Sequence, residues 1–229
     1  MVAAIHSRRV PAAALAVAGL LFVLYPLLRP FSSEVGLDGA RAFASSRWVL
    51  AHSFGIFAFI LLGFGALGLY MRLRETDVGR SAMGALTLMW LGVGLTLPYY
   101  GAEAFGLHAV GRRVLAQNDP SALEPLAHAI RFGAGIWFIV AGLLLLGVGG
   151  VVLAAAVWRS GRLERWSAIP LAAGLLLYLP QFGGGHSLRI AHGLVLLAGC
   201  LWLARELLGA PAERDAARTG SFGLRTQEG

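Results

Sequence analysis

Residues 135–158 read GIWFIVAGLLLLGVGGVVLAAAVW, and no charged residue interrupts this stretch. A helix needs about 20 apolar residues to cross the hydrocarbon core of a bilayer, so the stretch predicts a membrane-spanning helix. Five other segments approach or meet this length, and they are residues 10–29, 48–71, 81–106, 166–182 and 186–206. The sequence therefore predicts an all-α protein, a polytopic six-helix bundle in the membrane that covers residues 1–209.

The segment 166–182 is the shortest of the six. It contains Pro170 and Pro180, and only the three glycines at 183–185 separate it from the last segment. Because so short a break leaves no room for a loop, we expect a tight helical hairpin here.

The composition agrees with a chain that lies mostly in lipid. Hydrophobic residues make up 57% and charged residues only 14% of the 229 residues, whereas a soluble domain carries about 25% charged residues. The formal net charge of +7 comes from arginine, since the chain has no lysine, and we attribute it to membrane orientation rather than to a nucleic-acid partner. The single cysteine, Cys200, permits neither an internal disulfide nor a cysteine-only metal site.

The arginines predict the topology. Cytoplasmic loops of membrane proteins are enriched in basic residues. Arginines precede the first segment, follow the last, and gather between the second and third and between the fourth and fifth, at positions 8, 9, 72, 74, 80, 159, 162, 165 and 205. We therefore predict a multi-pass protein of the inner (plasma) membrane with both termini in the cytoplasm. The polar residues 210–229 are expected to form a disordered cytoplasmic tail.

This topology gathers polar side chains on the outer side. Five of the six histidines fall there: His52, His108, His128, His186 and His192. The other polar or aromatic residues on that side are Tyr99, Tyr100, Glu103, Arg131, Gln181 and Arg189. Because they come from segments scattered along the chain, the sequence predicts a polar pocket that opens on the outer face of the bundle.

Depth in the bilayer distinguishes these residues. At about 1.5 Å per residue, His192 lies about 20 Å from Arg205, inside the hydrocarbon, and Arg189 lies one turn nearer the surface. An ionisable side chain at that depth needs a partner. Glu103 lies within an apolar segment, so we predict a Glu103–Arg189 ion pair with His52 or His192 nearby.

Several functions are compatible with these residues. The first hypothesis is a pocket that binds a small ligand, a metal or a lipid headgroup, with Glu103 and Arg189 setting its charge and Tyr99 and Tyr100 at its rim. The alternative is a b-type haem electron carrier, which needs two opposed histidines; His52 and His192 are the best pair. A transition metal in a metal-dependent hydrolase would use His52, His192 and His128.

Two further alternatives are a proton-coupled transporter and a non-catalytic assembly subunit whose polar groups only fix helix packing. The pattern does not decide whether the protein is an enzyme, and it favours a non-enzymatic role. The stretch 63–68, GFGALG, matches GxGxxG but follows no strand, so it predicts close helix packing and a possible helix-mediated oligomer instead of a dinucleotide site.

The six-segment pattern and the stretch 97–108, LPYYGAEAFGLH, resemble those of small multi-pass membrane proteins of GC-rich bacteria. This resemblance implies a membrane location. It implies no activity and no site residue.

Overall fold

The computed structural model describes residues 8–209, which form helices and turns without a strand. Five helices are long and apolar enough to cross a membrane. They are α2 (Arg9–Leu28), α4 (Ser46–Leu73), the continuous helix Gly79–Gln117, α8 (Gly135–Ser160) and α10 (His186–Leu208). The all-helical class is confirmed for these residues, and the five helices are consistent with a multi-pass membrane protein. The predicted disordered tail at 210–229 lies outside the described residues.

The third spanning helix is longer than the sequence predicted. It runs through α5 (Gly79–Gly101), the π-helix η1 (Ala102–Gly106) and α6 (Leu107–Gln117) without a break. The predicted segment ended at residue 106, where the apolar run ends. The helix continues because α6 is amphipathic and buries one face against α3 (Gly36–Ala44), a helix that the sequence analysis did not predict.

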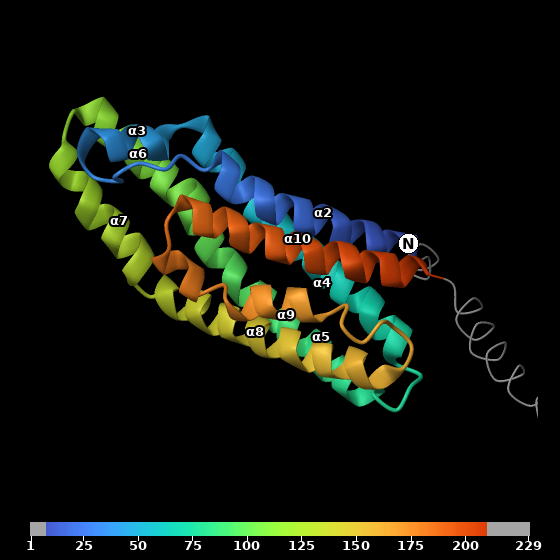
Figure 1. Cartoon of the computed structure of the whole chain (residues 1–229). Coiled ribbons are helices and arrows are strands. Elements are labelled where there is room, and N and C mark those ends of the chain that lie inside the picture. Colours follow the sequence, from blue (N-terminus) through green and yellow to red (C-terminus); the bar gives the residue numbers. More distant parts are fainter. Residues whose placement is uncertain (1–7, 210–229) are drawn as a thin grey trace, which may run out of the picture.

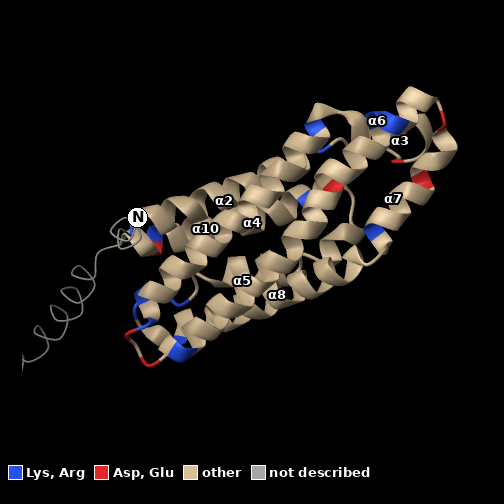
Figure 2. Ribbon diagram, turned by 180° about the vertical axis from the view of Figure 1, so that it is seen from behind, with Lys and Arg blue, Asp and Glu red and all other residues tan. Residues whose placement is uncertain are grey.

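The long helices form a ring. Going round it, α2 packs on α4, α4 on α5, α5 on α8, α8 on α9 (Ile169–Leu176), α9 on α10, and α10 again on α2. Helix α2 begins and α10 ends at the same end of the bundle (Figure 1). Charged residues concentrate at the two ends, and a long stretch between them carries almost none (Figure 2).

The fifth predicted span is not a complete helix. Only Ile169–Leu176 forms an α-helix, and a turn and the 3-10 helix η3 (Pro180–Gly183) follow it. Pro180 has no N–H group to donate to the carbonyl of Leu176, and its ring crowds that carbonyl, so the α-helix ends at Leu176. The segment nevertheless runs back along the bundle between α8 and α10 (Figure 1). The predicted helix over 166–182 is therefore wrong in its extent, whereas its path along the bundle is retained.

A small cap lies beyond one end of the ring. It consists of α3, α6 and α7 (Leu123–Phe132), with η2 (Pro120–Ala122) leading into α7 (Figure 1). The cap has an apolar cluster of its own, separate from the core of the ring, formed by Ala40, Phe43, Trp48, Leu107, Val114, Leu123 and Ala127. This cluster fixes the cap above the end of the ring where the polar side chains of α2, α4 and α5 lie.

Glycines allow α5 and α8 to approach closely. A Cβ atom on Gly92 would lie 2.8 Å from the carbonyl oxygen of Gly142 and 2.9 Å from the backbone nitrogen of Leu146. Backbone atoms cannot move aside cheaply, so Gly92→Ala is expected to destabilise the protein by about 1–3 kcal/mol. Thermal unfolding in one detergent measures this.

The matched control is Gly84→Ala on the same helix, because a Cβ at Gly84 meets nothing within 4 Å. It is expected to be neutral or to stabilise the helix by up to about 1 kcal/mol. Equal destabilisation by both substitutions would show that helix contact at Gly92 is not the cause.

Candidate functional site

A pocket of about 600 Å³ lies at the end of the ring that faces the cap. Its walls come from α2 and the segment after it, from α4, α5, η1, α7, α8, the segment after α9, and α10. The charged or ionisable side chains that line it are Arg29, Glu34, His52, Glu103, Arg131 and Arg189. Every helix of the ring except α9 itself thus contributes a side chain. Of the predicted polar set, six residues line the pocket and His192 and Gln181 do not; the six are His52, Tyr99, Tyr100, Glu103, Arg131 and Arg189.

A chain of alternating charges crosses the top of the pocket. Arg131 on α7 donates from Nε and Nη2 to the two carboxylate oxygens of Glu103, at 2.6 and 3.1 Å. Its Nη1 donates to Glu34 at 2.7 Å, and Arg29 donates to the other oxygen of Glu34 at 2.5 Å. Two-pronged arginine–carboxylate contacts are the strongest of the ordinary ion pairs. This network ties the cap to α2 and η1.

A π-helix positions Glu103. In η1 the N–H of Leu107 bonds to the carbonyl of Ala102, five residues back instead of four. The carbonyl oxygen of Glu103 itself accepts a hydrogen bond of 2.8 Å from the indole Nε1 of Trp48 on α4. Single π-turns inside α-helices occur frequently at functional sites. Here the turn lies at Glu103, one of the two carboxylates that line the pocket within residues 8–209.

His52 lies beneath Glu103 and is 1% exposed. Its Nδ1 lies 2.8 Å from the carbonyl oxygen of Trp48, one helical turn earlier. A carbonyl only accepts, so Nδ1 carries the hydrogen and Nε2 is the nitrogen that faces Glu103, at 3.6 Å from its Oε2. Glu103 therefore has His52 on one side and Arg131 on the other.

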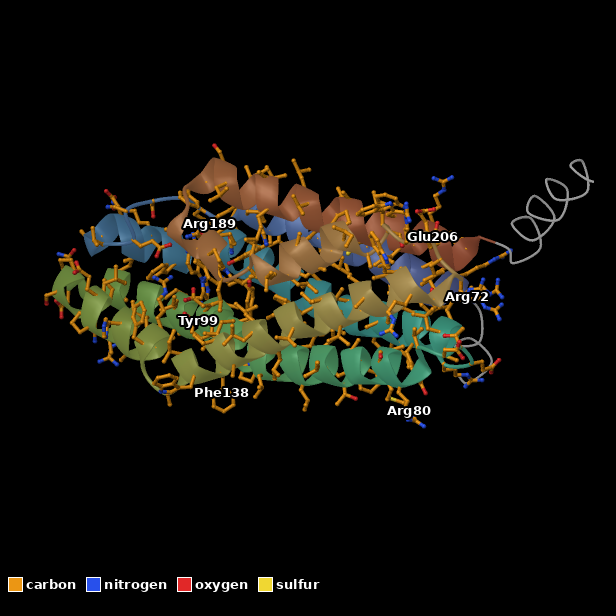
Figure 3. All side chains as sticks on the ribbon, turned by 60° about the horizontal axis from the view of Figure 1, so that its bottom comes forward. Arg72, Arg80, Tyr99, Phe138, Arg189 and Glu206 are labelled. Carbon is orange, nitrogen blue, oxygen red and sulfur yellow. The ribbon has the colours of Figure 1, made fainter. Side chains whose placement is uncertain are left out.

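Arg189 does not pair with Glu103, and the predicted Glu103–Arg189 ion pair is wrong. Its guanidinium donates to the carbonyl oxygens of Phe182 at 2.8 Å and Gly184 at 3.3 Å. It lies against the rings of Phe31 and Phe182, at 5.4 and 5.7 Å from their centroids. Arg189 and Tyr99 lie in the same part of the bundle, far from Arg72, Arg80 and Glu206 (Figure 3).

The lining of the pocket has an excess of positive charge. It contains three guanidinium groups, Arg29, Arg131 and Arg189, but only two carboxylates, Glu34 and Glu103. Arg189 forms no ion pair with a carboxylate within residues 8–209, and the buried Nε of Arg29 has no hydrogen-bond acceptor there.

Arg131 stays charged in this setting. Burial alone lowers the pKa of its guanidinium, but the hydrogen bonds to Glu103 and the charges of Glu103 and Glu34 outweigh burial, so the pKa is raised above its ordinary value. The guanidinium of Arg131 is therefore charged at any physiological pH.

Aromatic side chains close the pocket on the side of the bundle core. Tyr100 is 3% exposed, and its hydroxyl lies 2.9 Å from that of Tyr178. The ring of Tyr25 packs 5.7 Å from that of Tyr100. Tyr100 thus belongs to the floor of the pocket instead of its rim, whereas Tyr99 is half-buried in the wall.

The predicted histidine sites are not assembled. His192 directs Nε2 to the carbonyl oxygen of Gly174 at 2.7 Å, while His52 faces Glu103, so the two are not arranged as a haem pair. His128 is exposed on α7, where its ring packs on Phe132 at 4.9 Å. Within residues 8–209, no three His, Cys, Asp or Glu side chains come together in a way that could hold a metal ion.

His108 and His186 bond to backbone carbonyls, and Gln181 lies outside the pocket. His108 lies 3.0 Å from the carbonyl oxygen of Phe43, and His186 lies 3.0 Å from that of Pro26. Gln181 is buried beside a small cavity behind Arg189, which His192 also lines. Gln181 thus lies next to the pocket without lining it.

Sequence reasoning missed two members of the charge network. Arg29 ends the first apolar segment, where an arginine ordinarily extends to the membrane interface, so its position alone does not indicate a site. Glu34 lies in a short loop with φ of 53°, and no feature of the sequence places it over the pocket.

Comparisons with known proteins do not assign this chain to a family. No protein-family model, no curated protein and no solved structure matches the chain.

Proposed function

We propose that the protein is a multi-pass membrane protein that binds a small anionic ligand or headgroup in the pocket beneath the cap. The observation that carries this proposal is the uncompensated charge of the lining: three guanidinium groups against two carboxylates, with Arg189 held by carbonyl oxygens instead of a carboxylate. Arginine recognises carboxylate and phosphate groups because its planar fork matches their geometry.

The arrangement of Arg189 supports a binding role. Phe31 and Phe182 flank its guanidinium, and the unwound backbone after α9 supplies its two carbonyl acceptors. Non-helical backbone at membrane depth is tolerated where it is buried or lines a cavity. The backbone from Leu177 to Gly185 interrupts the fifth segment. Under this proposal, the interruption serves to hold Arg189 at the pocket.

The proposal includes the topology. Helix α2 begins and α10 ends at one end of the bundle, so the segment between α8 and α10 serves as a sixth, interrupted crossing. Arg72, Arg74, Arg80, Arg159, Arg162, Arg165 and Arg205 lie at that end. Following the positive-inside rule, that end is cytoplasmic, both termini are inside, and the pocket faces outward from the plasma membrane.

Substituting Arg189 tests the binding role. Arg189→Gln is expected to weaken the binding of glycerol phosphate, a soluble anionic headgroup, by about ten- to a hundredfold, since a hydrogen bond to a charged group contributes about 1.5–3 kcal/mol. Arg189→Lys, which keeps a positive charge without the fork, is expected to lose less. Isothermal titration calorimetry of the purified protein in detergent measures all three affinities.

Arg112→Gln is the matched control, because Arg112 is exposed on α6 at the same end of the molecule and does not line the pocket. It is expected to bind glycerol phosphate as the original chain does. If Arg189→Gln remains folded and binds equally well, or if Arg112→Gln weakens binding to the same extent, the proposed pocket is not the anion site.

A further inference from the structure

We propose that the natural ligand is an anionic lipid of the outer leaflet, which enters the pocket sideways between α8 and the segment after α9. This inference rests on the proposed function, because it assigns a ligand class to the same pocket. It depends on three observations: the depth of the pocket, the separation of its polar and apolar walls, and the packing of α8.

Aromatic residues on α8 define the depth. Trp137 is 74% exposed near the start of the helix, and Trp158 is 42% exposed near its end. They are 21 residues apart, which corresponds to about 32 Å along a helix, close to the thickness of a hydrocarbon core. Exposed tryptophans at such a spacing mark the two membrane interfaces. Ile136, which lines the pocket, is therefore at the level of the lipid headgroups.

The walls of the pocket differ in character from side to side. The charged wall contains Arg29 just after α2, Arg131 on α7 and Arg189 near the start of α10. The wall contributed by α8 is apolar and consists of Ile136, Ile139 and Val140. A ligand that satisfies both walls has its charge against the arginines and its apolar part against α8, and an anionic lipid is such an amphipathic molecule.

The side wall between α8 and η3 is not closed by extensive helix contact. Helix α8 packs on α9 toward the cytoplasmic side, whereas η3 packs on α10 and makes no extensive contact with α8. Val140 on α8 and Leu179 before η3 both line the pocket and thus flank this side. Phe132 and Trp137, which are 60% and 74% exposed, lie at the α7–α8 junction above it. A lipid can enter here without crossing the cap.

The volume agrees with partial uptake of a lipid. A pocket of about 600 Å³ is of the size that holds a drug-like molecule. It accommodates a headgroup and the first part of the acyl chains, and the rest of the chains then extends through the side wall into the bilayer. The positive excess selects a headgroup with net negative charge over a zwitterionic one.

Filling the apolar wall tests this inference. Val140→Trp places a large side chain in the part of the pocket assigned to the acyl chains, while the arginines remain. The matched control is Val148→Trp on the same helix, since Val148 is 50% exposed and lies outside the pocket. Native mass spectrometry of each variant after purification from mixed vesicles counts bound dioleoyl phosphatidylglycerol and dioleoyl phosphatidylcholine, and calorimetry measures glycerol phosphate.

The original chain and Val148→Trp are expected to retain phosphatidylglycerol in preference to phosphatidylcholine. Val140→Trp is expected to retain about tenfold less phosphatidylglycerol, the effect of losing about two methylene contacts, and to bind glycerol phosphate unchanged. Two results would overturn the inference and leave the proposed function intact, provided that glycerol phosphate binding depends on Arg189. In the first, Val140→Trp retains as much phosphatidylglycerol as the original chain. In the second, the original chain prefers neither lipid. If Arg189→Gln changes the binding of neither probe, the proposed function fails and the inference with it.

Discussion

Glu103→Ala is expected to lower the free energy of unfolding by about 3 kcal/mol, because it removes one partner of a buried ion pair and leaves the other charges uncompensated. The side chain of Glu103 is 11% exposed and that of Arg131 is 18% exposed, so little water replaces the lost carboxylate. Because Arg131 keeps Glu34 as a partner, the expected loss of stability is at the lower end of the range for breaking a buried ion pair. Thermal or denaturant unfolding in a fixed detergent measures the change.

Glu103→Gln separates charge from shape. Its amide oxygen takes the place of Oε1 and accepts from Nε of Arg131, whereas its NH2 group takes the place of Oε2 and cannot accept from Nη2 of Arg131. We therefore expect this variant to lose clearly less stability than Glu103→Ala. A Gln variant as unstable as the Ala variant would mean that the charge of Glu103, and not its hydrogen bonds, supports the site.

Asp38→Asn provides the control for an ion pair that contributes little. Asp38 pairs with Arg41 on α3, and both side chains are well exposed, at 77% and 64%. Exposed pairs contribute about 0–1 kcal/mol, so the unfolding midpoint is expected to stay almost unchanged. If Glu103→Ala destabilises the protein no more than Asp38→Asn does, the network over the pocket has no structural role.

The parts of the fold that depend on local sequence could be predicted. Long apolar runs predict helices, and α2, α4, α8 and α10 lie within a few residues of their predicted bounds. The interruption of the fifth segment could be anticipated from Pro180, but how the chain continues after it could not. That depends on Arg189, whose hydrogen bonds to Phe182 and Gly184 stabilise the unwound backbone.

The partners within the site could not be predicted, because they depend on elements outside the spans. Depth along the helices placed Glu103 and Arg189 near one another, and both residues line the pocket. The predicted ion pair between these two residues is nevertheless wrong. The helix break at Gly133 turns α7 over the pocket, so Arg131 lies next to Glu103 and pairs with it. The cap that carries Arg131 forms through tertiary contacts of short amphipathic helices, which leave only a weak signal in the sequence.

Phe43→Ala is expected to destabilise the cap by about 3–5 kcal/mol, the usual cost of truncating a fully buried phenylalanine. Phe43 is 0% exposed, its ring packs 4.6 Å from that of Trp48, and the guanidinium of Arg131 lies 5.3 Å from its centroid. Because the cap cluster is separate from the core of the ring, the loss is expected to remain local. Hydrogen exchange is expected to rise about a hundredfold or more in α3, α6 and α7, and little in α2 and α8.

Phe105→Ala is the matched control, since Phe105 lies on η1 near the cap but is 58% exposed. It is expected to leave exchange in the cap unchanged. If Phe43→Ala accelerates exchange equally in the cap and in α8, the cap and the ring unfold together and the cap is not a separate unit. If exchange rises only in the cap, Arg131 loses its fixed position over Glu103, and binding of phosphatidylglycerol is expected to weaken even though no residue that lines the pocket has been changed.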